Sequence, residues 1–495
     1  MRTKNFIISN AYYFVVLPLL ISILFIEGCS DNSTDVIKEN PIVTSQIKSP
    51  PIEPCYPVPT DKQLEWQDSE IMMFIHFGIN TFTNKEWGDG TEDPLLFNPR
   101  NLNVLQWVQI AKEIGFKYVI LTAKHHDGFC LWPSKYTNHS IKYSPYKNGN
   151  GDIVKEFADA CHANGIKFCI YLSPWDRHES TYGSSGYDIY YQNQLIELLT
   201  NYGDIGEFWF DGAPDPSYGI KLHNYNWDLY WSTVRYYQPD VLMANWGPDI
   251  RWVGNEEGLG YETEWAWQTR NFSMQKSDSY NKVWYPAEAD VSIRPGWFYH
   301  SSEDFKIKTV DQLVDIYLKT VGRNTNLLLN VPPNTDGQFS SYDIQRLRDW
   351  KRRLSEIFAK DLFFGKEITC SNVRNNSDAY SAKNCLDNNR NTFWVTDKDI
   401  NNAVLDINLG KKEKINIIRL EEAVRFGQRI KAFEVDYDNN GTMETIFSGT
   451  TIGHSRIITF PAVETEKIRI LIKDSYAAPT LCEIKGYYSD QIRVQ

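Results

Sequence analysis

Short apolar runs alternate along residues 56–360 with longer segments whose apolar residues recur three and four positions apart. The apolar runs have the length and the Val, Ile and Phe content of buried strands, and the longer segments have the period of amphipathic helices. The predicted strands are Ile71–Phe77, Tyr118–Thr122, Lys167–Leu172, Gly206–Phe210, Val241–Ala244 and Asn326–Asn330. The predicted helices are Val104–Ile114, Ile153–Ala163, Tyr190–Leu199, Trp227–Tyr237, Val310–Val321 and Ser341–Phe358.

Strands and helices that alternate at this period predict βα units around a parallel sheet. A stretch of roughly 300 residues with this many units favours a closed (β/α)8-like barrel over an open doubly wound sheet. The open sheet is further disfavoured because no strand is followed by a Gly-rich phosphate turn. We therefore predict the barrel over residues 56–362.

Residues 363–495 follow a different pattern, in which short runs rich in Val, Ile and Phe are separated by Asn, Asp and Gly. This spacing is typical of an all-β sandwich. The runs are Ala403–Ile407, Ile415–Leu420, Ala432–Tyr437, Ser455–Phe460 and Lys467–Ile472. The chain is thus predicted to be multidomain, with an α/β barrel followed by a β-sandwich.

The N-terminus has the pattern of an export signal over residues 1–28. Arg2 and Lys4 precede a nearly all-apolar run of 16 residues from Ala11 to Ile26, which is short for a membrane-spanning helix. Gly28 followed by Cys29 resembles a bacterial lipobox, which implies lipidation of Cys29. We expect an exported bacterial lipoprotein, anchored in the membrane and located in the periplasm or at the outer membrane and cell surface. The alternative is a plain secretory signal.

The stretch from Cys29 to residue 55 is rich in Ser, Asn, Asp and Pro and predicts a flexible tether. Seven cysteines remain after Cys29, an odd number with no CxxC spacing, so neither a zinc site nor a disulfide scaffold is indicated. The candidate disulfide pairs are Cys370 with Cys385 and Cys370 with Cys482.

Composition narrows the classes of function. Hydrophobic residues make up 42% of the 495 residues and aromatic residues 14%, which excludes a disordered chain. The net charge of −12, without a long Lys/Arg run, argues against nucleic acid as a partner. The 16 Trp and 29 Tyr suit a protein that stacks on sugar rings, although an ordinary core accounts for most of them.

Polar residues gather directly after five of the predicted strands. In a barrel these positions face one mouth, where active sites are built. One such residue could be a helix cap, but five equivalent positions predict a site. The residues are His76, then His125, His126 and Asp127, then Trp175 and Asp176, then Asp211, and finally Asn245 and Trp246.

The residues at this mouth suggest two kinds of site. A metal site on His76, His125, His126 and Asp127 is not expected, because adjacent histidines point in opposite directions and no HxH or HExxH spacing occurs. Neutral imidazoles that hydrogen-bond to hydroxyl groups fit better. The second kind is a carboxylate pair, as glycoside hydrolysis requires. Asp211 is one member, and the residues alone do not rank the candidates for the other: Glu256, Glu257, Glu264 and Glu288.

Three motifs resemble the α-L-fucosidases of glycoside hydrolase family 29. They are Phe74–Gly78, Tyr118–Phe129 with its Lys-His-His-Asp-Gly-Phe block, and Phe208–Gly212. The resemblance covers about residues 60–360 and implies a barrel, a β-sandwich and a retaining mechanism that needs no cofactor. Asp211 matches the nucleophile. The residues that match the fucose pocket are His76, Trp87, His125, His126, Tyr171 and Trp209.

The segment Arg251–Glu256 resembles the branch of this family that is selective for α-1,3/1,4-linked fucose, and this implies Glu256 as the acid/base. Glu257 and Glu288 are the competitors for that role, and Glu288 is also a candidate contact. The segment Ile293–His300 resembles the same branch and adds Arg294 and Trp297 to the substrate site. An aromatic wall, such as Trp297 or Phe298, is expected against the C6 methyl of fucose.

The C-terminal part resembles a discoidin-like (coagulation-factor type C) domain through Ala382–Asp387 and Asn391–Trp394. That family often binds sugars, sometimes with a structural calcium ion, and the alternative is a domain that only packs against the barrel. The predicted function is an exo-acting α-L-fucosidase on fucosylated oligosaccharides or glycoconjugates. The alternatives are an α-L-galactosidase of the same family and a non-catalytic glycan-binding surface lipoprotein.

Overall fold

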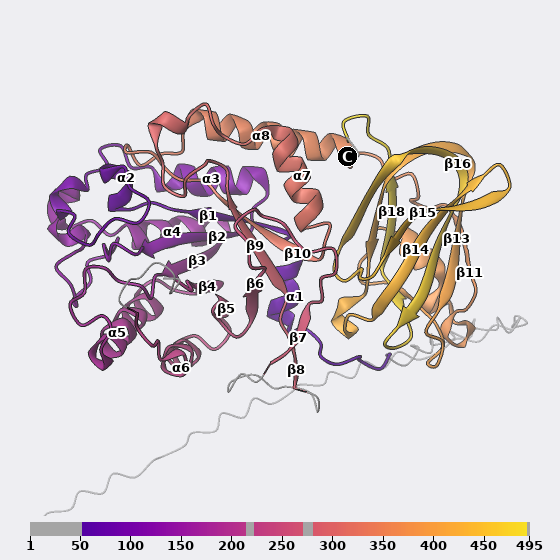
Figure 1. The fold of residues 1–495 in the computed structure, drawn as a ribbon, viewed down its shortest axis with the longest axis horizontal. Coiled ribbons are helices and arrows are strands. Elements are labelled where there is room, and N and C mark those ends of the chain that lie inside the picture. Colours follow the sequence, from indigo (N-terminus) through magenta and orange to yellow (C-terminus); the bar gives the residue numbers. More distant parts are fainter. Residues whose placement is uncertain (1–51, 214–221, 271–280, 493–495) are drawn as a thin grey trace, which may run out of the picture. The chain divides into compact units, whose positions relative to one another are not determined.

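The computed structural model describes residues 52–213, 222–270 and 281–492 (Figure 1). The predicted signal over residues 1–28 and the lipidation candidate Cys29 lie outside the described residues.

The last residues of the predicted tether pack against the C-terminal domain. Ile52 is buried, and the Cys55 amide donates to the Phe426 carbonyl oxygen over 2.8 Å. These contacts hold Ile52 and Cys55 in place, so this described end of the predicted tether is not a free linker.

Eight parallel strands close into a barrel in the order β1-β10-β9-β6-β5-β4-β3-β2, which confirms the predicted (β/α)8-like fold. The strands are β1 (Ile71–Ile75), β2 (Tyr118–Lys124), β3 (Lys167–Leu172), β4 (Glu207–Phe210), β5 (Leu242–Asn245), β6 (Ile250–Trp252), β9 (Ala287–Ser292) and β10 (Thr325–Asn330). The sequence pattern did not predict β6 and β9. β6 has only three residues, and β9 places Glu288 and Asp290 where an apolar strand was sought.

Helices cover the outside of the barrel (Figure 1). They are α2 (Ile79–Thr83), α3 (Val104–Ile114), α4 (Ile153–Asn164), α5 (Ser185–Asn201), α6 (Trp227–Tyr237), α7 (Val310–Thr320) and α8 (Ser341–Ile357). The first helix, α1 (Asp61–Gln67), instead places Trp66 in the core inside the barrel. Local signals set their ends. Thr60 and Thr309 form capping boxes with Gln63 and Gln312. Between β6 and β9 the described residues form a hairpin of β7 (Trp267–Thr269) and β8 (Lys282–Trp284).

Alternate residues of the strands point into the barrel and fill it. Phe74, Tyr171 and Trp209 lie in this inner core, with ring centroids 5.3 to 5.8 Å apart. The inner core is separate from the larger apolar layer between strands and helices. The inner core fills the barrel below its C-terminal mouth. The polar residues that follow the strands therefore lie above this core, at the mouth.

The C-terminal part is an antiparallel β-sheet domain, as predicted. Its strands are β11 (Glu367–Cys370), β12 (Trp394–Val395), β13 (Ala403–Glu421), β14 (Ile430–Asn439), β15 (Thr442–Gly449), β16 (Arg456–Ser475), β17 (Thr480–Leu481) and β18 (Glu483–Tyr487). The first two predicted runs are one strand, β13, and the last two are one strand, β16. Both are interrupted by irregularities in their pairing, which the polar residues between the runs mark.

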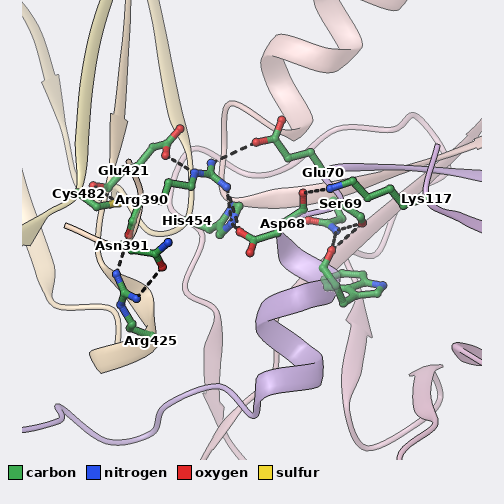
Figure 2. Close-up of polar contacts among 12 residues, drawn as sticks. Asp68, Ser69, Glu70, Lys117, Arg390, Asn391, Glu421, Arg425, His454 and Cys482 are labelled. Carbon is green, nitrogen blue, oxygen red and sulfur yellow. Dashed lines mark hydrogen bonds and ion pairs between the residues drawn. The ribbon is translucent and has the colours of Figure 1, made fainter. Parts of the chain in front are cut away.

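A network of ion pairs joins the barrel to the β-domain (Figure 2). Arg390 of the β-domain lies 3.0 Å from Asp68 and 3.2 Å from Glu70 of the barrel, and 2.5 Å from Glu421 at the end of β13. Arg419 pairs with the same two glutamates. Burial alone would raise the pKa of Glu421, but Arg419 and Arg390 outweigh it and lower this pKa to about 2.

All seven described cysteines are free thiols, so neither candidate pair of Cys370 forms a disulfide. Cys130, Cys161 and Cys169 lie buried in the barrel, and Cys385 and Cys482 lie buried in the β-domain. Among the helices of the described residues, none combines the length and apolar character needed to cross a membrane.

We predict that Arg390→Ala lowers the free energy of unfolding at pH 7 by about 1 to 3 kcal/mol, because it removes one of two cations from the buried Glu421. Arg390 is one-third exposed, so the loss is smaller than for a fully buried pair. The lowered carboxyl pKa values mean that the contribution is complete above about pH 5 and is lost as the pH falls toward 2. Urea unfolding at pH 7 and pH 3 measures both effects.

The matched control is Arg352→Ala, which removes exposed ion pairs on α8. Its expected effect is within about 0.5 kcal/mol. If the two variants are equally stable at pH 7, the network does not hold the two parts together.

Candidate active site

Asp211 follows β4 at the C-terminal mouth of the barrel. The Tyr171 hydroxyl, from β3, donates to Asp211 Oδ2 over 2.8 Å, and the Ala213 amide donates to Oδ1 over 2.9 Å. Each carboxylate oxygen is thus oriented by one donor, while 21% of the side chain remains exposed. The result is a fixed carboxylate that a ligand can reach.

His126 faces this carboxylate with an unprotonated nitrogen. Ser173 Oγ donates to the Trp175 carbonyl oxygen over 2.7 Å, so it accepts from His126 Nδ1–H over 2.8 Å. Burial lowers the pKa of His126 to about 4, and Asp211 only partly opposes this. His126 Nε2 therefore presents a lone pair 3.8 Å from Asp211 Oδ2. Two acceptors this close call for a donor, such as a ligand hydroxyl group.

His76 is held in the same neutral form. The Asn330 amide nitrogen donates to the Trp297 carbonyl oxygen over 2.8 Å, which leaves its Oδ1 to accept from His76 Nδ1 over 2.9 Å. Burial lowers the pKa of His76 to about 3. His76 Nε2 is therefore a second acceptor at the mouth.

His125 lies between these two rings. Its ring centroid is 4.0 Å from that of His126 and 5.4 Å from that of His76. Burial, reinforced by the two neighbouring histidines, lowers the pKa of His125 well below its ordinary value. Its Nδ1 is buried and has no hydrogen-bond partner among the described residues. The three histidines therefore offer neutral ring nitrogens rather than positive charges.

Trp209 and Glu288 lie deeper in the barrel. Trp209 Nε1 donates to Glu288 Oε2 over 2.7 Å, and Trp66 Nε1 donates to Glu207 Oε2 over 2.7 Å. Burial raises the pKa of Glu207 to about 8 and that of Glu288 well above its ordinary value, and Glu207 raises the latter further. Glu207 begins β4 and Glu288 is the second residue of β9, so Glu288 lies below Trp209, toward the opposite end from Asp211.

The four carboxylates that the sequence could not rank occupy different surroundings. Glu288 is buried below the mouth, Glu264 is buried in an ion pair with Arg251, and Glu257 is exposed. Glu256 is accessible to solvent and receives a hydrogen bond from the Trp297 side chain.

The surroundings of Glu256 raise the pKa of its carboxyl group. Partial burial raises the pKa of Glu256, the Trp297 hydrogen bond opposes the shift, and the negative charges of Asp211 and Glu86 raise it further. An accessible carboxyl group with a raised pKa beside a fixed carboxylate is the pattern that separates an acid from a nucleophile.

Two acidic residues that the sequence analysis did not single out belong to this mouth. Asp290 Oδ1 accepts from Trp252 Nε1 over 2.6 Å, and burial, with added repulsion from Glu256 and Asp211, raises the pKa of Asp290 to about 7. Glu86 accepts from the Trp297 amide over 2.7 Å and lies 2.6 Å from His300 Nε2. Recognising β9 as a strand would have revealed Asp290, since residues two apart share a face. Nothing local marks Glu86.

Arg294 is fully buried and its guanidinium is occupied by protein carboxylates. Its Nε donates to Asp343 over 2.9 Å and its Nη2 donates to Asp304 over 2.9 Å. These contacts anchor the segment that carries Trp297. The Arg294 side chain is therefore placed to support the mouth rather than to meet a ligand.

Aromatic rings complete the mouth. Trp87 is 38% exposed and its ring stands edge-on to His126, 6.4 Å away. Trp297 lies 5.1 Å from the His76 ring, and the buried Phe298 lies 5.0 Å from His125 and 5.5 Å from His76. Trp297 and Phe298 therefore form an aromatic wall on one side of His76 and His125.

Polar side chains of the loop that carries the discoidin-like motif are bound within the protein. Asp387 accepts from the Asn389 amide and from the Thr392 hydroxyl, and Arg390 of the same loop contacts the barrel. Over residues 52–213, 222–270 and 281–492, no group of three His, Cys, Asp or Glu side chains is arranged to hold a metal ion.

The barrel and the β-domain each match a known protein family. The Alpha-L-fucosidase family model matches residues 91–355, and the F5/8 type C domain model matches residues 367–484. Alpha-L-fucosidase 1 of Arabidopsis thaliana is 41% identical over 474 residues, which cover 93% of this chain and 91% of that protein. Plasma alpha-L-fucosidase of Homo sapiens is 26% identical over 57% of this chain and 59% of its own length.

Solved structures agree along most of the chain. A putative alpha-L-fucosidase from Bacteroides thetaiotaomicron superposes with a TM-score of 0.82 at 36% identity, covering 89% of this chain and all of that one. A family 29 fucosidase of Ruminococcus gnavus, solved in complex with fucose, superposes with a TM-score of 0.81 at 31% identity over 89% of this chain and 96% of that one.

Proposed function

The chain belongs to the α-L-fucosidase family of glycoside hydrolases, and we propose that it releases terminal α-1,3/1,4-linked L-fucose from branched glycans through Asp211 and Glu256. Hydrolysis of α-L-fucosides is the activity of this family. The linkage and the two catalytic residues are the proposal. The observation that carries it is an accessible Asp211 carboxylate, oriented by two hydrogen-bond donors, together with a Glu256 whose pKa is raised by partial burial and further by the charge of Asp211.

The first step is attack by Asp211 on the anomeric carbon. Asp211 Oδ1 and Oδ2 each accept one hydrogen bond, so the carboxylate is held without an ion pair that would have to break before attack. Glu256 gives its proton to the glycosidic oxygen, and a β-fucosyl ester forms as the aglycone leaves. Glu256 then takes a proton from water, which attacks the ester and releases α-L-fucose with net retention.

The neutral histidines give the pocket its preference for hydroxyl groups. His76 and His126 each present an unprotonated Nε2, and a sugar hydroxyl can donate to it. Trp297 and Phe298 are aromatic and adjoin His76, so they suit the C6 methyl of fucose. An α-L-galactosidase would need a polar partner for a C6 hydroxyl in that place, which makes it the weaker candidate.

Three of the sequence candidates take supporting places in this proposal. Trp209 stacks on Tyr171, with centroids 5.5 Å apart, and so holds the ring whose hydroxyl orients Asp211. Glu288 supports Trp209 from below, and Arg294 supports Trp297 through its loop. A non-catalytic glycan binder is disfavoured because it would have no use for an acid with a raised pKa beside a carboxylate.

The anomer of a fucosyl azide tests the two catalytic roles. We predict that Asp211→Ala lowers kcat on 4-nitrophenyl α-L-fucoside by more than about 10⁴-fold, because no ester can form, and that added azide yields the β-azide by direct inversion. Glu256→Ala should lower hydrolysis of natural linkages by about 10²- to 10⁴-fold. With the aryl fucoside its ester still forms, and azide should convert the ester to the α-azide. NMR of the products distinguishes the anomers.

Glu257→Ala is the matched control, since Glu257 is the exposed neighbour of Glu256, and near-normal turnover is expected. The raised pKa of Glu256 sets the alkaline limb of kcat/KM in the parent, because the acid must be protonated. That limb should vanish in Glu256→Ala on the aryl fucoside. An α-azide from Glu288→Gln in place of Glu256→Ala would reassign the acid.

The linkage is tested with two natural substrates. We predict that residues 30–495 release fucose from a Lewis-type trisaccharide and not from 2′-fucosyllactose, because the Arg251–Glu256 segment resembles the α-1,3/1,4-selective branch. An NMR time course follows both substrates and shows the α anomer as the first product. Equal release from both would leave the family assignment intact and remove the linkage.

We also propose that the exported chain is held at a membrane by lipid on Cys29, supported by the apolar run that precedes Gly28. The parent expressed in a bacterium should partition into detergent with the membrane fraction, and Cys29→Ser should be recovered in the soluble fraction. Ser30→Ala is the matched control and should remain with the membrane. A parent protein that is already soluble contradicts the anchor.

A further inference from the structure

Glu256 lies on a loop whose two ends are joined by an ion pair. We call residues 253–264, which follow β6, the acid loop. Arg251 Nη2, from β6, pairs with Glu264 Oε2, and both side chains are largely buried. Glu264 Oε1 also accepts from the Tyr261 amide over 3.4 Å. The ion pair therefore closes the acid loop at its base.

The β-domain binds the end of the acid loop. Gln428 Oε1 accepts from the Ala266 amide over 2.7 Å, and Gln428 Nε2 donates to the Glu264 carbonyl oxygen over 3.0 Å. Thr451 Oγ1 accepts from the Glu264 amide over 3.2 Å. All four residues are buried, so these backbone groups would lack a partner without the β-domain side chains.

The residues just before Glu264 are held from the same side. Arg456, at the start of β16, donates from Nη1 to the Glu262 carbonyl oxygen over 2.8 Å and pairs through Nη2 with Glu262 Oε2 over 2.6 Å. The hydroxyl groups of Thr263 and Thr450 are 2.6 Å apart. Residues 262, 263, 264 and 266 thus each contact a side chain of the β-domain.

The middle of the acid loop rests on the end of α7, which the β-domain also holds. The Gly260 amide donates to the Lys319 carbonyl oxygen over 2.9 Å. Beyond α7, the Asn324 amide donates to the Ser455 carbonyl oxygen over 2.9 Å, and Asn324 Nδ2 donates to the Glu264 carbonyl oxygen over 3.1 Å. The support that α7 gives to the acid loop therefore depends on the second domain as well.

The turn that carries Glu256 is bound mainly to itself. Asn255 Oδ1 accepts from the Glu257 amide over 3.1 Å and from the Leu259 amide over 3.4 Å, and Asn255 Nδ2 donates to the Leu259 carbonyl oxygen over 3.0 Å. Such a turn moves as a unit with the ends of its loop. A catalytic group displaced by about 1 Å can cost up to about 10²-fold in rate.

We propose that Gln428 and Thr451 of the β-domain are positioning residues for the acid Glu256. They hold Glu264, and the ion pair of Glu264 with Arg251 fixes the loop that presents Glu256 to the glycosidic oxygen. Both residues are buried, so they act through the loop and not on the ligand. The inference rests on the proposed function, because it takes Glu256 as the acid.

The test uses two leaving groups that differ in their need for a proton. The sugar alkoxide of a Lewis-type trisaccharide is protonated as it leaves, whereas 4-nitrophenolate leaves without a proton. Gln428→Ala should lower kcat/KM for the trisaccharide about tenfold, mainly through kcat, because a displaced acid donates less well in the transition state. The same variant should change kcat/KM for 4-nitrophenyl α-L-fucoside by less than twofold.

A second position keeps the test open if Gln428→Ala folds poorly. Thr451→Val retains the shape of the side chain but removes the acceptor of the Glu264 amide, and it should show the same selective loss, about threefold. Thr451→Ser retains the hydroxyl group and should turn over the trisaccharide within twofold of the parent.

The pH profile gives a readout that a change in stability alone does not move. Partial burial and the charges of Asp211 and Glu86 raise the pKa of Glu256, and Asp290 belongs to the same group of carboxyl groups. A Glu256 that has moved toward solvent loses part of this burial. The alkaline limb of kcat/KM for the trisaccharide should therefore shift to lower pH in Gln428→Ala.

Asn416→Ala is the matched control. Asn416, in β13, makes the same pair of bonds as Gln428 but within the β-domain: it accepts from the Ser489 amide over 3.0 Å and donates to the Ser489 carbonyl oxygen over 2.7 Å. This variant should lower the stability of the β-domain without a selective loss on the trisaccharide and without a shift of the alkaline limb.

Two failures can be told apart. If Gln428→Ala and Thr451→Val lose activity equally on both substrates, or on neither, while Glu256→Ala shows the selective loss, the positioning role is overturned and the proposed function stands. If Glu256→Ala itself loses activity equally on both substrates, the proposed acid is wrong and the inference falls with it.

Discussion

The pairing of β1 with β10 closes the barrel, and the candidate active site is built across this seam. Residues 71–74 pair with residues 327–330, which come from opposite ends of the barrel sequence. Asn330 is the last residue of this pairing and His76 follows β1. The Asn330 side chain fixes the His76 tautomer and also donates to the carbonyl oxygen of Trp297. Because Trp297 in turn hydrogen-bonds Glu256, the closure of the sheet is transmitted to the proposed acid. If the pairing of β1 with β10 were lost, His76, Trp297 and Glu256 would no longer be held in fixed positions relative to one another.

Two sets of buried carboxyl groups in this protein have different partners and opposite shifts of their pKa. At the junction of the domains, arginines surround Glu70 and Glu421 and keep them ionised. Inside the barrel, an indole N–H donates to each of three other acids: Trp66 to Glu207, Trp209 to Glu288 and Trp252 to Asp290. An indole satisfies one oxygen without adding a positive charge, so burial raises the pKa of these three carboxyl groups.

The sequence predicted the barrel because six of its strands are continuous apolar runs, and it predicted the mouth because polar residues follow those runs. It could not predict β9, since Glu288 and Asp290 face inward where hydrophobic side chains were sought. It also could not rank the four glutamates, because their difference lies in partners distant along the chain: Arg251 for Glu264, Trp209 for Glu288 and Trp297 for Glu256. Arg294 illustrates the same limit, since its two carboxylate partners come from α8 and from the segment before α7.

Both the barrel and the β-domain contain buried free cysteines, whose reactivity can report local unfolding of each domain. Burial raises the pKa of Cys161 and Cys169 in the barrel and of Cys385 and Cys482 in the β-domain, so these thiols do not react while the surrounding structure is closed. An alkylating reagent can reach them only through transient unfolding, at a rate that reflects the local stability of each domain. In the unmodified protein, the alkylation rates of these cysteines therefore show whether the two domains unfold together or one before the other.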